Sequence, residues 1–145
     1  MEGNNAVGIS IPALKQLLEL RNNQALKGDI LLLGRMSPMF TTRKFLRTLH
    51  QHGIQNETIS ISKDYSDIFR HNPNDVEIFK AIGFTNVFSI DVSPYEGADF
   101  VLDLNKPLPH NFNKKFDFIY DGGTLEHVFD FPQALSNLHL SLIHI

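Results

Sequence analysis

Short apolar runs alternate with longer amphipathic stretches along the chain, and the two patterns predict different elements. The segment Asp29–Gly34 is a nearly continuous apolar run that ends in glycine, which is typical of a strand buried on both faces of a parallel sheet. Similar short runs predict strands at Val87–Asp91, Phe100–Leu102 and Phe116–Tyr120. Alternating polar and apolar residues at Thr58–Ser62 predict one more short strand.

Apolar residues recur at helical spacing between these runs. Ser10 is placed to cap the first helix, and Pro12 lies in its first turn, where the missing N–H costs little. Gly53 and Gly83 follow two other apolar stripes and indicate helix ends. The predicted helices are Ser10–Ala25, Met39–His52, Asp75–Ile82 and Phe131–His139, with a helical turn at Tyr65–Phe69.

The order of these elements predicts the fold class. Strands interleaved with helices indicate an α/β fold, a Rossmann-like three-layer sandwich with a mostly parallel sheet. Right-handed crossovers bring the carboxyl ends of the strands to one edge, where ligands bind in such folds. Four segments are expected at that edge: Gly34-Arg35, Asp91, Asp103–Asn105 and Asp121–His127.

Composition narrows the functional classes. The 145 residues suit one domain, and the net charge of -3 argues against a nucleic-acid partner. The basic residues Arg43, Lys44 and Arg47 share one predicted helix, and we interpret them as a solvated face. With no cysteine, disulfides, zinc–thiolate sites and cysteine nucleophiles are excluded, and a cytoplasmic location is expected. The histidines lack ligand spacing, and no signal peptide or membrane-spanning run is evident, so we expect no metal and no membrane contact.

One stretch carries a family resemblance. FDFIYDGGTLEHVFDFPQAL, Phe116–Leu135, resembles the part of class I S-adenosylmethionine-dependent methyltransferases in which the fourth strand runs into a GTLEH-type loop and a helix. SIDVSPYEGADFVLDLN, Ser89–Asn105, resembles the preceding part, where an acidic residue ends the second strand. The resemblance covers roughly Asp29–His139. It implies an enzyme with S-adenosylmethionine as cofactor and an unidentified methyl acceptor, either a small molecule or a protein.

The resemblance also implies cofactor-binding residues. Asp91 would accept hydrogen bonds from the ribose hydroxyls, with Val92 beside it. Asp103 would meet the adenine amine, and the N–H of Leu104 a ring nitrogen. Plainer interpretations stand beside these. Asp91 could simply end a strand, and Asp103-Leu104-Asn105 followed by Pro107 is good turn chemistry.

Other predicted contacts surround the methionine end of the cofactor. Gly34 would let the backbone approach the cofactor closely. Arg35 would meet the methionine carboxylate of the cofactor, although a solvated loop arginine is an equal alternative. The loop Asp121, Gly122 and Gly123 would complete this end.

Glu126 and His127 form an adjacent acid–base pair and are the candidates for catalysis. The alternative, which we favour, is a helical turn capped by Thr124 that contains both. Methyl transfer often needs little more than positioning, so a dedicated base is not required.

The first loop departs from the family pattern. The family has a glycine-rich E/D-x-G-x-G-x-G loop, whereas this chain reads LLLGRMSPMF, with Gly34 alone. Two alternatives follow. A nicotinamide-dependent oxidoreductase would need a G-x-G-x-x-G turn, which is missing here. The second alternative is a non-catalytic binding or scaffold module of the same fold.

The last residues differ in character from the rest. LSLIHI, residues 140–145, resembles the peptide obtained by translating a sequencing-adapter end, and we expect a non-native tail there. Residues 1–139 would then form a partial methyltransferase domain, the N-terminal half of the fold with an incomplete sheet.

Overall fold

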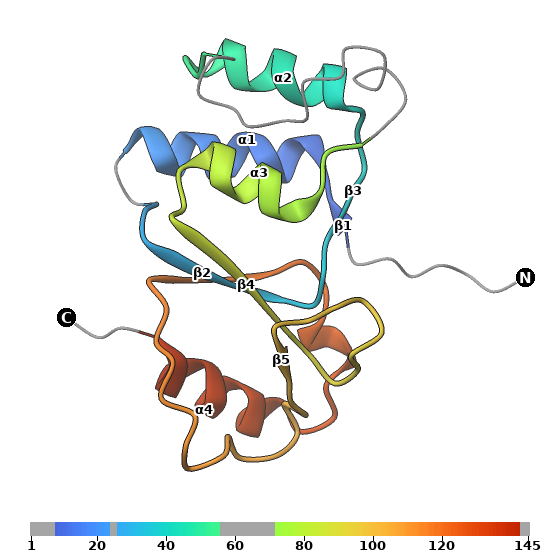
Figure 1. Ribbon diagram of the computed structural model, residues 1–145, viewed down its shortest axis with the longest axis vertical. Helices are drawn as coiled ribbons and strands as arrows, with labels where there is room; N and C mark the ends of the chain where they lie inside the picture. Colours follow the sequence, from blue (N-terminus) through green and yellow to red (C-terminus); the bar gives the residue numbers. More distant parts are fainter. Residues whose placement is uncertain (1–7, 24–25, 56–71, 143–145) are drawn as a thin grey trace, which may run out of the picture. The chain divides into compact units, whose positions relative to one another are not determined.

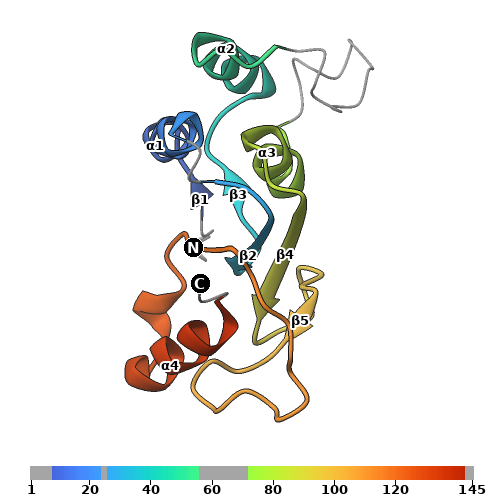
Figure 2. The same cartoon turned by 90° about the vertical axis from the view of Figure 1, so that its left-hand side faces the viewer.

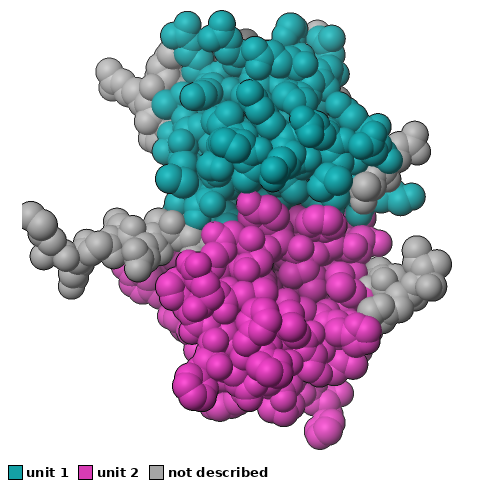
Figure 3. All heavy atoms as spheres, turned by 180° about the vertical axis from the view of Figure 1, so that it is seen from behind, with its two compact units in different colours: residues 1–27, 36–84 teal, residues 28–35, 85–145 magenta. Residues whose placement is uncertain are grey.

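The computed structural model describes residues 8–23, 26–55 and 72–142. The chain forms two compact units, distinguished by colour in Figure 3. Unit 1 comprises Met1–Lys27 and Met36–Phe84, and unit 2 comprises Gly28–Arg35 and Thr85–Ile145. The predicted strand at Thr58–Ser62 and the predicted turn at Tyr65–Phe69 lie outside the described residues.

Unit 2 contains a four-stranded parallel sheet in the order β5-β4-β2-β6. Figure 1 labels β5, β4 and β2 of this sheet. Its strands are β2 (Asp29–Leu33), β4 (Asn86–Asp91), β5 (Phe100–Val101) and β6 (Phe118–Asp121). Numbered along the chain, this order is 3-2-1-4, which matches the beginning of the doubly wound order 3-2-1-4-5-6. The predicted α/β class with a parallel sheet is therefore confirmed.

The core of unit 2 lies between the sheet and helix α4 (Phe131–Ser141). Leu31 and Leu33 of β2 share one face of the sheet, as the two-residue period of a strand requires. They pack in one cluster with Ala134 of α4 and with Phe116, which precedes β6. The rings of Phe88, Phe100, Phe112 and Phe116 extend this cluster, with neighbouring centroids 5.3–6.1 Å apart. Edge-to-face pairs at such separations stabilise apolar cores beyond simple area burial.

The described residues of unit 1 form three α-helices and a small parallel sheet (Figure 2). The helices are α1 (Ile11–Asn22), α2 (Thr42–Gln51) and α3 (Asp75–Ile82), and the sheet pairs β1 (Gly8–Ile9) with β3 (Ser37–Pro38). Ser10, Thr41 and Asn74 cap the helices through their side chains, and Asn74 forms a capping box with Glu77. The predicted cap at Ser10, the position of Pro12 in the first turn and the end of α3 at Gly83 are confirmed.

Several element boundaries differ from the prediction: α1 ends at Asn22 and not at Ala25, β4 begins at Asn86, and β5 ends at Val101. Two further differences have identifiable reasons. Helix α2 begins at Thr42 and not at Met39, because Ser37–Pro38 pairs with β1 and Thr41 supplies the cap. Strand β6 begins at Phe118 and not at Phe116, because Phe116 forms an isolated parallel bridge with Leu142.

The C-terminal helix extends beyond the predicted His139. Helix α4 continues to Ser141, whose carbonyl accepts a hydrogen bond from the N–H of Phe116 at 2.9 Å. Residues 143–145 lie outside the described part, and the assignment of residues 140–145 as a non-native tail stays a prediction. Among the described helices, none combines the length and hydrophobicity needed to cross a membrane.

Candidate functional site

The carboxyl ends of β2, β4 and β6 meet in unit 2, where the sequence predicted a ligand site. Gly34 follows β2 with a φ of 79°, a conformation that favours glycine, and its N–H donates to the carbonyl of Ile90 at 2.8 Å. The Oγ1 of Thr124 donates to the carbonyl of Leu33 at 2.6 Å. These bonds hold the loops after β2 and β6 against the sheet edge.

A pocket of about 160 Å³ opens at this edge. Four predicted cofactor residues line it together: Asp91, Val92, Asp103 and Leu104. The other lining residues are Ile90, Leu102, Asn105, Thr124, His127 and Val128. Its volume is below the range of about 300–1,000 Å³ typical of drug-sized ligands, so it suits part of such a ligand, for example a nucleoside.

Gly34 borders the same residues. A Cβ added to it would lie 3.2 Å from the Oγ1 of Thr124 and 3.7 Å from the Oδ2 of Asp91. The absence of a side chain at this position therefore keeps space open beside two residues that line the pocket.

Asp91 ends β4, and one of its carboxylate oxygens makes no hydrogen bond to the described residues. Its Oδ1 accepts a hydrogen bond from the N–H of Ser93 at 2.9 Å, which fixes the side chain in a local turn. Its Oδ2 accepts no hydrogen bond from the described residues. This half-buried carboxylate can therefore accept hydrogen bonds from a ligand without breaking a contact of the fold.

Asp103 forms the turn that its sequence suggested. Its Oδ1 accepts hydrogen bonds from the backbone N–H and the Nδ2 of Asn105, at 3.0 and 2.9 Å. Its Oδ2 lies 3.5 Å from the Nζ of Lys106. The hydrogen bonds from Asn105, followed by the charge of Lys106, lower the pKa of the Asp103 carboxyl below its usual value. The turn interpretation of Asp103 is confirmed, and its role toward adenine stays a prediction.

A buried amide on α4 fixes the loop that contains Leu104. Asn137 is 1% exposed, and its Nδ2 donates to the carbonyls of Leu104 and Lys106 at 3.0 and 2.9 Å. Its Oδ1 accepts from the N–H of Leu108 at 3.2 Å and from the Nε2 of Gln133 at 3.0 Å. The N–H of Leu104 donates to no acceptor within the described chain. Sequence reasoning missed Asn137, whose only signal was a polar residue inside an apolar helix stripe.

The loop after β6 is organised by Asp121. Its Oδ1 accepts hydrogen bonds from the N–H groups of Gly123, Thr124 and Leu125 at 3.1, 2.7 and 3.3 Å. The expected helical turn is present as the 3₁₀ turn η2 (Leu125–His127). The prediction that Thr124 caps it was wrong, because the Thr124 hydroxyl bonds to β2 and Asp121 takes the capping role.

The catalytic candidates lie on η2. The Nε2 of His127 is 3.4 Å from the Oε1 of Glu126, and their side chains are 61% and 71% exposed. His127 lines the pocket, whereas Glu126 does not.

The residues predicted for the methionine end, Arg35 and Asp121–Gly123, are also not among those lining the pocket. Just before this loop, burial and the neighbouring charge of Asp121 raise the pKa of Tyr120.

Replacing Gly34 with alanine should destabilise unit 2. A left-handed backbone costs a non-glycine residue about 1–2 kcal/mol, and here the new methyl also meets Thr124. Gly97→Ala is the matched control, since Gly97 has a φ of 70° and open space around its Cβ position. Urea unfolding should show a larger loss for Gly34→Ala than for Gly97→Ala. Equal losses would mean that the space beside Gly34 is not constrained.

Among the described residues, no group of three or more His, Asp or Glu side chains is arranged to hold a metal ion. A scan against protein-family models and searches of curated proteins and of solved structures find no significant match to the chain.

Proposed function

We propose that unit 2 binds the nucleoside part of S-adenosylmethionine and that the protein transfers the methyl group of this cofactor to an acceptor. One observation carries the proposal. A carboxylate oxygen of Asp91 and the N–H of Leu104 are unused by the described protein, and both residues line one pocket. That pocket lies at the carboxyl edge of a sheet with the order 3-2-1-4, the edge at which open α/β sheets bind ligands.

The residues fit the groups they would meet. Asp91 would accept hydrogen bonds from ribose hydroxyls through Oδ2, because Oδ1 is already bound to Ser93. The N–H of Leu104 would donate to an adenine ring nitrogen. Asn137 holds Leu104 in place for this contact, because its side chain binds the carbonyl of the same residue. Val92 is 69% exposed and offers apolar surface for a base to cover. Arg35, Asp103 and Asp121–Gly123 keep their predicted roles as proposals.

When bound, the cofactor supplies an electrophilic methyl group on a positively charged sulfur. The contribution of this chain is mainly to bind and orient. A buried general base is not supported by the geometry, because the Glu126–His127 pair faces solvent. His127 remains the weaker proposal for moving a proton, since it lines the pocket. Positioning of the acceptor would account for most of the rate enhancement.

Each alternative rests on the first loop. A dinucleotide site needs a helix that starts directly after the glycine turn, so that its N-terminus meets the pyrophosphate. Here β2 ends at Leu33 and α2 begins only at Thr42, with β3 between them, which argues against a nicotinamide cofactor. The single glycine of this loop favours a binding module without catalysis as the second candidate. The cytoplasmic location stays part of the proposal.

A thermal-shift comparison of two ligands separates these functions. We expect adenosylhomocysteine, the product form of the cofactor, to raise the melting temperature, because a ligand that binds only the folded state stabilises it by mass action. NAD at the same concentration should have no effect. Stabilisation by NAD alone would favour an oxidoreductase. A cooperatively melting chain that responds to neither ligand would favour the scaffold module.

A further inference from the structure

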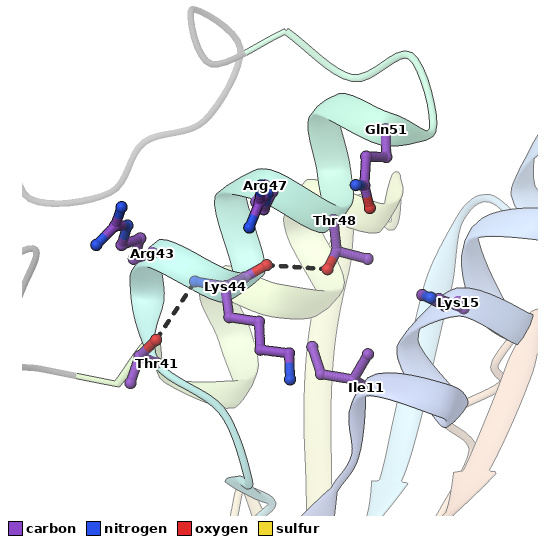
Figure 4. Close-up of a pocket in the computed structure, with 8 residues that line it drawn as sticks. All are labelled: Ile11, Lys15, Thr41, Arg43, Lys44, Arg47, Thr48 and Gln51. Carbon is purple, nitrogen blue, oxygen red and sulfur yellow. Dashed lines mark hydrogen bonds between the residues drawn. The ribbon is translucent and has the colours of Figure 1, made fainter.

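A basic groove lies within unit 1 and shares no lining residue with the pocket of unit 2. Its volume is about 430 Å³, within the range of roughly 300–1,000 Å³ for small-molecule sites. Helix α1 contributes Ile11 and Lys15, and α2 with its cap contributes Thr41, Arg43, Lys44, Arg47, Thr48 and Gln51. Figure 4 shows the side chain of Lys44 extending from α2 toward Ile11 on α1. The groove is therefore bounded by cations from two helices.

The described residues do not balance the charges of this groove. Lys15, Arg43, Lys44 and Arg47 are all exposed, and none forms an ion pair with a described carboxylate. None of the described lining residues is acidic. Cations grouped around a concave surface focus their field into it and raise the local concentration of anions.

The arrangement also works against the stability of the helix itself. Arg43 and Lys44 lie in the first turn of α2, which contains no acidic residue, and Arg47 lies one turn further along the helix. The helix dipole favours negative charge there, and Arg43 and Arg47 are a like-charge pair at i, i+4 spacing. A bound anion would relieve both repulsions, because it meets the positive helix end and the cations together.

The lining residues also limit the kind of anion. They include no aromatic side chain, so stacking of unpaired bases has no platform among them. The buried Thr48 spends its hydroxyl on the carbonyl of Lys44 at 2.9 Å, and the Thr41 Oγ1 accepts from the N–H of Lys44. Recognition therefore falls to the ammonium and guanidinium groups, which bind phosphate oxygens through charge-assisted hydrogen bonds.

We propose that the groove between α1 and α2 binds a small ligand bearing a diphosphate or comparable pair of phosphate groups, held by Lys15, Lys44 and Arg47. The inference is independent of the cofactor site in unit 2. The exposure of Arg43, Lys44 and Arg47 agrees with their interpretation as a solvated face, and the proposal adds a ligand for that face to bind.

Calorimetric titration of inorganic pyrophosphate into the full chain tests the proposal. We expect saturable one-site binding that Lys44→Gln/Arg47→Gln weakens at least about tenfold, since each lost contact is charge-assisted. Lys15→Gln should weaken it as well, because Lys15 lies on the opposite wall. The matched control is Lys27→Gln/Lys80→Gln, which removes the same charge from exposed positions of unit 1 and should leave the affinity within about twofold. Circular dichroism confirms that each variant is folded.

Several outcomes would overturn the proposal. The absence of pyrophosphate binding by the folded chain is the first. An equal loss in both double variants is the second, because it would indicate diffuse attraction to net charge. Tighter binding of a short oligothymidylate than of pyrophosphate is the third, because it would assign the groove to nucleic acid. The Asp91→Asn substitution, which alters the proposed cofactor site, should leave the affinity for pyrophosphate unchanged. The cofactor proposal and the pyrophosphate proposal can therefore fail separately.

Discussion

Replacing Asn137 with leucine should destabilise unit 2 by about 3 kcal/mol or more, because a buried polar group left without its partner costs about 1–3 kcal/mol. The leucine would leave the carbonyls of Leu104 and Lys106 and the N–H of Leu108 without the amide that now binds them. Leucine has the same number and branching of side-chain heavy atoms as asparagine, and the site has only 1% exposure, so water cannot easily replace the lost partner. Urea unfolding followed by circular dichroism measures the effect.

Asn113→Leu is the control for this substitution. Asn113 is exposed and makes no hydrogen bond within the described chain, so its replacement should change the free energy of unfolding by less than about 0.5 kcal/mol. Similar unfolding midpoints for the two variants would contradict the view that Asn137 holds the Asp103–Leu108 loop. A loss in Asn137→Leu alone would identify this amide as a structural support of the candidate site.

Replacing Asp91 with asparagine should weaken adenosylhomocysteine binding roughly 10- to 100-fold, because hydrogen bonds to a charged group contribute about 1.5–3 kcal/mol. The asparagine keeps an oxygen for the N–H of Ser93, so the local turn persists. The other carboxylate oxygen, Oδ2, is replaced by an amide NH₂ group, which donates hydrogen bonds and cannot accept them from ribose hydroxyls. Isothermal titration calorimetry measures the change in dissociation constant.

Glu96→Gln is the matched control for Asp91→Asn. Glu96 is an exposed carboxylate in the segment after β4, and its replacement removes the same charge without a described contact. We expect its dissociation constant to stay within about twofold of the unaltered chain, since exposed charges contribute little at ordinary ionic strength. Equal weakening by both substitutions would mean that net charge, and not the ribose contact, controls binding.

The strands and helices were predictable where burial alone determines the pattern. The run at residues 30–33 has no polar position, and the structure buries all of it in the centre of the sheet. Strands β1 and β3 could not be predicted, because two residues are too short to show alternation and their pairing joins segments far apart in the sequence. The start of α2 was missed for the same reason, since the β3 pairing delays the helix to Thr42.

The candidate site was predictable in its residues and less so in its supports. Asp91, Asp103 and Leu104 were placed at the carboxyl edge from the order of the elements, Val92 was added by the family resemblance, and the structure brings all four to one pocket. The capping of η2 by Asp121 depends on the path of the loop, because the Thr124 hydroxyl forms its hydrogen bond with Leu33 of β2 instead. The fit of Asn137 to the loop spans 33 positions in sequence, which no local pattern encodes.

Amide-resolved NMR during a titration with adenosylhomocysteine tests the central proposal most directly. The N–H of Leu104 has no acceptor in the described protein, so a hydrogen bond to the base should shift its resonance strongly, together with that of Val92. Saturating shifts at these two residues, lost in Asp91→Asn, are the expected result. A folded chain whose Leu104 and Val92 resonances do not move at millimolar ligand would contradict the proposal that this pocket holds the nucleoside.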